Sequence, residues 1–216
     1  MLKSLVRFHC DCFDSFHKTS ILLKSISDIS LLEFFSLVGG KFSDNIDWRL
    51  EKKIKRIILR HSRLTPSVIR IIGQAPSVLH IELIDCEFPN LDKNKEIFFH
   101  PKIRCIGIHG NKKNNYDRQL SLNVLDNLEK FPELKMLKIK ISKEDFPLVK
   151  NKIYYSNNII RVLIFFDDIK SPETDKFIAS IRRDRAIYVD YYSAWQDLLW
   201  QASSKSDASI GLTQQK

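Results

Sequence analysis

The stretch FPELKMLKIKIS, which runs from Phe131 to Ser142, contains the pattern that decides the fold. Leu134, Leu137 and Ile139 occupy positions 1, 4 and 6 of the pattern L-x-x-L-x-L, and Pro132 lies two residues before the first of them. Because alternate side chains of a strand point to opposite faces, this pattern predicts a short strand whose positions 4 and 6 face a core. Positions 3, 5 and 7 of the same strand then face the other side of the sheet.

The pattern recurs along the chain at nearly even spacing. Clear copies begin at Ile54, Val78, Ile103, Leu134 and Ile160, and weaker copies begin at Leu5, Leu32 and Ala186. The first positions of successive copies are 22 to 31 residues apart, close to the roughly 20–29 residues of a repeat with this strand pattern. In the copy that begins at Ile160, the predicted core positions are Leu163 and Phe165.

Apolar residues at helical spacing predict helices between these strands. The predicted helical segments are 14–27, a short helix over 46–50, 65–73, a short helix or turn within 89–101, 120–128, 146–155, 175–183, and an aromatic segment over 191–200 that covers the end of the core. The polar insert NKKNNYD, residues 111–117, is predicted to be an exposed loop because it lacks apolar residues at regular spacing.

The spaced strand pattern with Pro ahead of its first position resembles the leucine-rich-repeat superfamily, especially the irregular repeats attached to F-box proteins and those similar to ribonuclease inhibitor. This resemblance implies an α/β solenoid, with a curved parallel sheet of about seven to eight short strands and helices on the outer side. Residues 1–202 are expected to form this one domain. Residues 203–216 form a polar tail that we expect to be disordered unless it is bound.

The composition favours a polyanionic partner. Lysine and arginine number 35 against 26 acidic residues, so the formal net charge is +9, and such a balance favours nucleic acid. No apolar run approaches the roughly 18 residues of a membrane span, and the start of the chain lacks the features of a secretory signal. We therefore expect a cytoplasmic protein that does not bind membranes, with its four cysteines reduced.

Basic side chains fall on the face of the sheet that positions 3, 5 and 7 form. The predicted RNA- or partner-binding residues on this face are Arg7, Arg56, Arg60, His80, His109, Lys138 and Lys140, with Lys112 and Lys113 added from the polar insert. Arginine and lysine at such positions can neutralise backbone phosphates. The apolar part of the same face is predicted to contact protein or the tail, and its residues are Val162, Ile164, Phe166, Tyr188 and Tyr192.

The sequence contains none of the phosphate-binding, metalloprotease or serine-hydrolase motifs. His80, Glu82 and His109 fall on adjacent predicted strands, but without a further ligand or a nucleophile we interpret them as surface residues rather than a catalytic or metal site. No cofactor, metal or small-molecule substrate is predicted.

The first functional hypothesis is a non-enzymatic repeat protein within a ribonucleoprotein, plausibly a lineage-specific ribosomal protein that contacts rRNA and neighbouring proteins. The alternative is a protein-recognition adaptor, such as the substrate arm of an F-box ubiquitin ligase.

Overall fold

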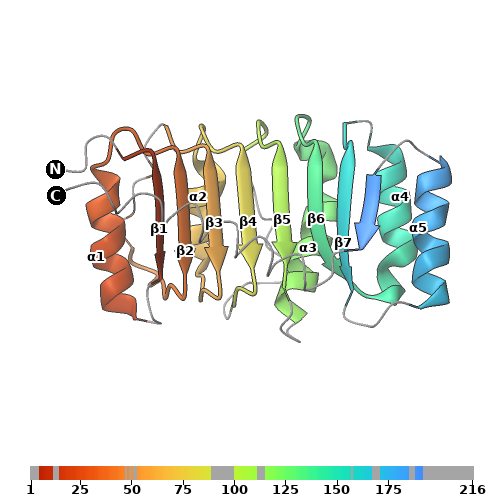
Figure 1. Cartoon of the computed structure of the whole chain (residues 1–216), viewed down its shortest axis with the longest axis horizontal. Helices are drawn as coiled ribbons and strands as arrows, with labels where there is room; N and C mark the ends of the chain where they lie inside the picture. Colours follow the sequence, from red (N-terminus) through yellow and green to blue (C-terminus); the bar gives the residue numbers. More distant parts are fainter. Residues whose placement is uncertain are drawn as a thin grey trace, which may run out of the picture.

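The fold is an open sheet of eight parallel strands that lie in sequence order, with helices between them (Figure 1). This computed structural model describes residues 5–11, 15–46, 48, 50, 53–88, 100–110, 115–156, 158–166, 171–184 and 188–191. The strands are β1 (Arg7–Asp11), β2 (Phe34–Val38), β3 (Arg56–Arg60), β4 (His80–Ile84), β5 (Cys105–His109), β6 (Met136–Ile141), β7 (Arg161–Phe166) and β8 (Tyr188–Tyr191). Every neighbouring pair is parallel.

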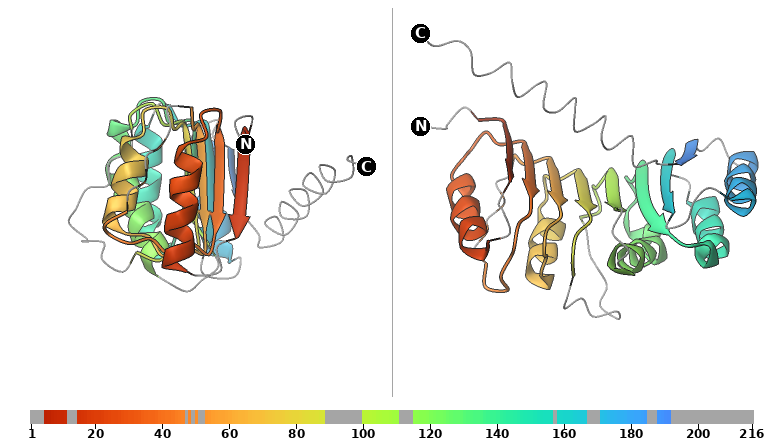
Figure 2. Two further views of the ribbon diagram at one scale, coloured as in Figure 1. Left: turned by 90° about the vertical axis from the view of Figure 1, so that its left-hand side faces the viewer. Right: turned by 60° about the horizontal axis from the view of Figure 1, so that its bottom comes forward.

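The helices that the structure describes lie on one face of this sheet, and none of them covers the other face (Figure 2, left). They are α1 (Phe16–Ser27), α2 (Pro66–Gln74), α3 (Asn115–Asp126), α4 (Phe146–Tyr155) and α5 (Pro172–Asp184), with short 3-10 helices η1 (Leu128–Lys130) and η2 (Lys143–Asp145). We call the strand face without helices the open face. The predicted α/β class and parallel sheet are confirmed.

Local sequence signals explain where these helices begin. The hydroxyl of Ser15 accepts a hydrogen bond from the backbone N–H of Lys18 at 3.3 Å, which caps the first turn of α1. Pro66 stands at the first position of α2, where its missing N–H costs no hydrogen bond.

Backbone hydrogen bonds repeat from one strand start to the next. The carbonyl of Glu33 accepts bonds from the N–H groups of Lys55 and Arg56, at 2.8 and 3.1 Å. The carbonyls that receive the same pair of bonds in other copies are those of Val6, Lys55, Leu79, Arg104 and Lys135. The repetition predicted from apolar side chains therefore extends to the backbone.

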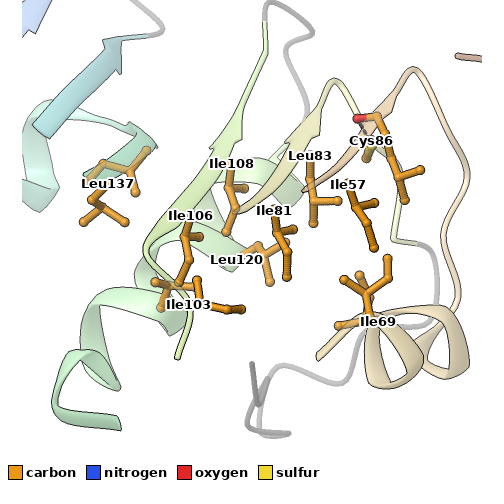
Figure 3. Close-up of a cluster of buried hydrophobic side chains, with 14 of the residues drawn as sticks. Ile57, Ile69, Ile81, Leu83, Cys86, Ile103, Ile106, Ile108, Leu120 and Leu137 are labelled. Atoms are coloured by element: carbon orange, nitrogen blue, oxygen red, sulfur yellow. Dashed lines mark hydrogen bonds between the residues drawn. The ribbon is translucent and has the colours of Figure 1, made fainter. Parts of the chain in front are cut away.

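The core lies between the sheet and the helices. Side chains at positions 4 and 6 of adjacent strands, among them Ile81, Ile106 and Leu137, lie in parallel rows beneath the sheet (Figure 3). Ile69 of α2 and Leu120 of α3 meet these rows from the helical side. The predicted core register is confirmed for β1 to β6, and the register of β8 places Val189 beside Val162, a core residue of β7.

The predicted register of β7 is wrong by one residue. Leu137 pairs with Val162 and Ile139 with Ile164, so the first core position of this copy is Ile159, which is 4% exposed, and not Ile160, which is 61% exposed. Val162 and Ile164 therefore belong to the core rather than to the open face. Arg161, Leu163 and Phe165 take the open face in their place.

Two local predictions also fail. Residues 44–46 form a turn and an irregular segment rather than the start of a helix, and Trp48 packs between Phe35 and Phe42, with ring centroids 5.6 and 6.0 Å away. The predicted polar loop ends earlier than expected, because α3 already begins at Asn115.

The helices predicted over 14–27, 65–73, 146–155 and 175–183 correspond to α1, α2, α4 and α5. The predictions for residues 89–99, for the aromatic segment 192–200 and for the tail 203–216 lie outside the described residues. Within the described part of the chain, no helix combines the length and apolar character needed to cross a membrane.

Candidate binding surface

The open face contains a buried carboxylate that basic side chains from four strands surround. Glu82 of β4 is 5% exposed. Its Oε1 lies 2.6 Å from Nζ of Lys138 on β6 and 3.0 Å from Nε2 of His109 on β5. Its Oε2 lies 3.3 Å from Nε2 of His80 and 3.7 Å from a guanidinium nitrogen of Arg56 on β3. We call these five residues the Glu82 cluster.

Hydrogen bonds within the Glu82 cluster keep the carboxyl group of Glu82 ionised. Burial alone would raise the pKa of Glu82, but hydrogen bonds from His109 and His80 and the charge of Lys138 outweigh it and hold the pKa far below its ordinary value. An ionised carboxylate only accepts hydrogen bonds, so both histidine nitrogens donate to it. Burial lowers the pKa of His80, although its bond to Glu82 acts in the opposite direction.

Gly107 makes this arrangement possible. It lies on β5 between Glu82 and Lys138 in the same row of the sheet. A Cβ atom at this position would stand 2.9 Å from Cγ of Glu82 and 3.4 Å from Cδ of Lys138. The absence of a side chain therefore lets Lys138 reach across β5 to a carboxylate 56 residues away in sequence.

The free energy of unfolding is expected to decrease in two steps as the pH is lowered. The unfolded chain takes up a proton at His80 below pH 6.5 and at Glu82 below pH 4.5, whereas the folded chain takes up each only at lower pH. The free energy of unfolding should therefore decrease as pH falls through 6.5, and decrease further below 4.5. One proton of difference corresponds to a slope of about 1.4 kcal/mol per pH unit.

Urea unfolding of the wild type and of Glu82→Gln, from neutral pH to below pH 4.5, measures this dependence. The variant should lose the part of the slope that appears below pH 4.5. Equal slopes for the two proteins in that range would contradict the assignment to Glu82.

The cluster does not form a nucleophile and base pair. Sγ of Cys105 lies 3.6 Å from Nε2 of His80, but that nitrogen already donates to Glu82 and is not available to accept the thiol proton. Burial raises the pKa of Cys105 to about 12. No group of three or more metal-ligating side chains is found in the described segments.

Two predicted contact residues and one predicted surface residue are buried. Lys140 and His109 are each 1% exposed, and Glu82, which we interpreted as a surface residue, is also buried. The ring of His109 stacks on that of Phe165, with centroids 3.9 Å apart and planes 7° apart. The two rings lie on either side of the Lys140 position in the same row, so this part of the open face is closed.

The other predicted contact residues differ in their surroundings, and some lie outside the described residues. Arg7 is exposed, Arg56, Arg60 and His80 are half-buried, and Lys138 is held by Glu82. Lys112 and Lys113 lie outside the described residues. In the apolar set, Val162 and Ile164 are in the core, Tyr188 pairs in register with Arg161, and Tyr192 is outside the described residues.

A line of cations in the described part of the chain lies along the edge where the strands begin, at the top of Figure 1. Its basic residues lie one position before, or one or two positions after, the first core position of a copy. We define the basic edge as Arg7, Lys53, Lys55, Arg56, Lys102, Arg104, Lys135 and Arg161. All of these side chains are exposed except that of Arg56, which is half-buried.

Few acids offset this charge. At the same positions of the described copies the acidic residues are Glu33, which pairs with Lys55 at 2.9 Å, and Glu133, which pairs with Arg104 at 3.5 Å. Acids are more frequent where the strands end, as Asp85, Glu87 and Asp145 show. Among the described residues, positive charge is therefore concentrated where the strands begin, and it includes the open-face residues Arg7, Arg56 and Arg161.

Most residues of the basic edge were not predicted from the sequence, because the predicted contacts came from positions 3, 5 and 7 and from the polar insert. Position 2 carried the signal in three copies, where it is Lys55, Arg104 or Lys135. Comparison of the chain with protein-family models, curated proteins and solved structures finds no match.

Proposed function

We propose that this chain is a non-enzymatic repeat protein of the leucine-rich-repeat type that binds RNA as a structural component of a ribonucleoprotein, plausibly the ribosome. The observation that carries the proposal is the basic edge, where five of the seven strands from β1 to β7 contribute cations and two acids lie among them. Such a line of lysine and arginine can neutralise successive phosphates and release their counterions.

The repeat assignment is supported by side chains beyond the apolar pattern. Gly40, Ser62 and Cys86 occupy the ninth position of successive copies, and all three are buried. The hydroxyl of Ser62 accepts from the N–H of Gly40 at 3.1 Å and donates to the carbonyl of Arg60 at 2.9 Å. Sγ of Cys86 lies 3.4 Å from the carbonyl of Leu59 in the preceding copy. Hydrogen bonds at the ninth position thus connect neighbouring copies of the repeat.

A sheet edge also suits a stable assembly. Neighbouring strands are about 4.8 Å apart, so the six spacings from β1 to β7 place the cations along a line of about 29 Å. The backbone beneath that line is fixed by the repeated hydrogen bonds at the strand starts. Little conformational freedom of the backbone would then be lost on binding.

Replacing two lysines of the basic edge should weaken RNA binding and its salt dependence. Lys53→Gln with Lys135→Gln removes up to two phosphate contacts, so the slope of log K against log salt should decrease by roughly 1–2. Fluorescence anisotropy with a structured rRNA fragment, titrated between 50 and 200 mM salt, measures this slope.

The matched control is Lys18→Gln with Lys176→Gln, which removes the same charge from exposed positions in α1 and α5. We expect this control to change the slope by less than half as much. No affinity at low salt, or equal effects of the two pairs, would refute the proposal. Sedimentation of tagged protein in a cell lysate adds a second test, because migration with a complex that lacks RNA would support the adaptor alternative.

A further inference from the structure

A hollow lies on the outer face of α4, the helix that precedes β7 in the chain. It is lined by Pro147, Lys150, Asn151, Tyr154 and Tyr155. These residues recur every three or four positions and so share one side of the helix, opposite the buried residues Val149 and Ile153. Parallel strands and their connecting helices run in opposite directions, so α4 ends at the edge where β7 begins.

The hollow contains an exposed aromatic surface. Tyr155 is 75% exposed, and its ring meets that of Tyr154 at 88° with centroids 5.3 Å apart. This perpendicular contact braces the two rings while most of Tyr155 remains accessible. Ile160, which follows in the connection to β7, is also exposed, and Arg161 of the basic edge comes directly after it.

Polar groups that can read a base lie beside the ring. Asn151 is exposed and stands one turn before Tyr155, so its amide offers both a donor and an acceptor next to the aromatic face. Lys150 contributes a cation to the same hollow. Proteins recognise unpaired RNA bases by this combination, in which the base stacks on an aromatic side chain and its edge forms hydrogen bonds.

We propose that this hollow binds an unpaired nucleobase of the RNA whose phosphates lie along the basic edge, with Tyr155 as the stacking surface and Asn151 as the hydrogen-bonding group. The inference rests on the proposed function and specifies its ligand. RNA with single-stranded nucleotides is then preferred over a perfect duplex, because paired bases cannot leave the helix to stack on Tyr155.

The test compares Tyr155→Ala with the wild type on a short unstructured oligoribonucleotide and on the same strand annealed to its complement. Stacking of one base is worth about 1–3 kcal/mol by alanine substitution, so Tyr155→Ala should weaken single-strand binding about 5- to 150-fold. Duplex binding should change less than about twofold, and the salt slope should stay constant because no phosphate contact is lost. Tyr155→Trp should retain the single-strand affinity.

Phe16→Ala provides the control, because Phe16 is a half-exposed aromatic residue on α1, at the far end of the sheet (Figure 1). If Tyr155→Ala lowers the affinity for both RNAs equally, or for neither, the proposed base site is refuted. The proposal for the basic edge would not be affected by that result. Failure of the wild type to bind either RNA would instead remove the proposed function itself.

Discussion

Replacing Glu82 by alanine is expected to lower the free energy of unfolding by about 3–5 kcal/mol, the usual cost of removing one partner from a buried ionic group. The side chain is buried, and His80, His109 and Lys138 all bond to its two oxygens. Without the carboxylate, their polar groups lose a common acceptor and the nearby cations repel one another. Urea denaturation at neutral pH measures the loss.

Two further variants separate charge from packing. Glu129→Ala removes an exposed glutamate and should change the free energy of unfolding by less than about 0.5 kcal/mol. Adding Lys138→Met to Glu82→Ala removes one uncompensated cation and should recover part of the lost stability. A cost below about 1 kcal/mol for Glu82→Ala would show that the cluster contributes little.

The second large effect concerns two adjacent isoleucines. Ile159→Ala is expected to cost about 2–5 kcal/mol, because the side chain is 4% exposed and its removal leaves a cavity in the core. Ile160→Ala, with the same change of atoms at a position that is 61% exposed, should cost less than about 0.5 kcal/mol.

Thermal or urea unfolding of the two isoleucine variants therefore determines the register of β7 directly. If Ile160→Ala proves the more damaging change, the strand is shifted by one residue and Arg161 leaves the open face. The pair is well matched, since neither substitution alters charge.

The apolar pattern predicts six strands in the correct register because each carries at least one polar or charged residue on one face only. In β6, Lys138 interrupts the apolar residues, and only one alternation places it away from the core. In β7 the run from Val162 to Phe166 is apolar on both faces, so hydrophobicity alone fits either register. Arg161 does not distinguish the two registers either, because the predicted one places it at position 2, where other copies carry the exposed residues Lys55, Arg104 and Lys135. The pairing of Leu137 with Val162 settles the register in the structure.

From the sequence, the members of the Glu82 cluster could be predicted only to lie on adjacent strands. The sequence places His80, Glu82 and His109 on adjacent strands, but the contact between Glu82 and Lys138 depends on the empty space above Gly107. The burial of Lys140 depends similarly on how the rings of His109 and Phe165 meet. Such contacts follow from side-chain shape across three strands, which periodicity does not encode.

The reach of Lys138 across β5 has a consequence for cooperativity. In a stack of repeats each unit touches only its neighbours, so unfolding can begin at either end and progress one unit at a time. Glu82 connects β3, β4, β5 and β6 through a shared carboxylate, and opening any one of these strands breaks bonds that the others use. The four central copies should consequently melt as a block, while the flanking copies fray independently of one another.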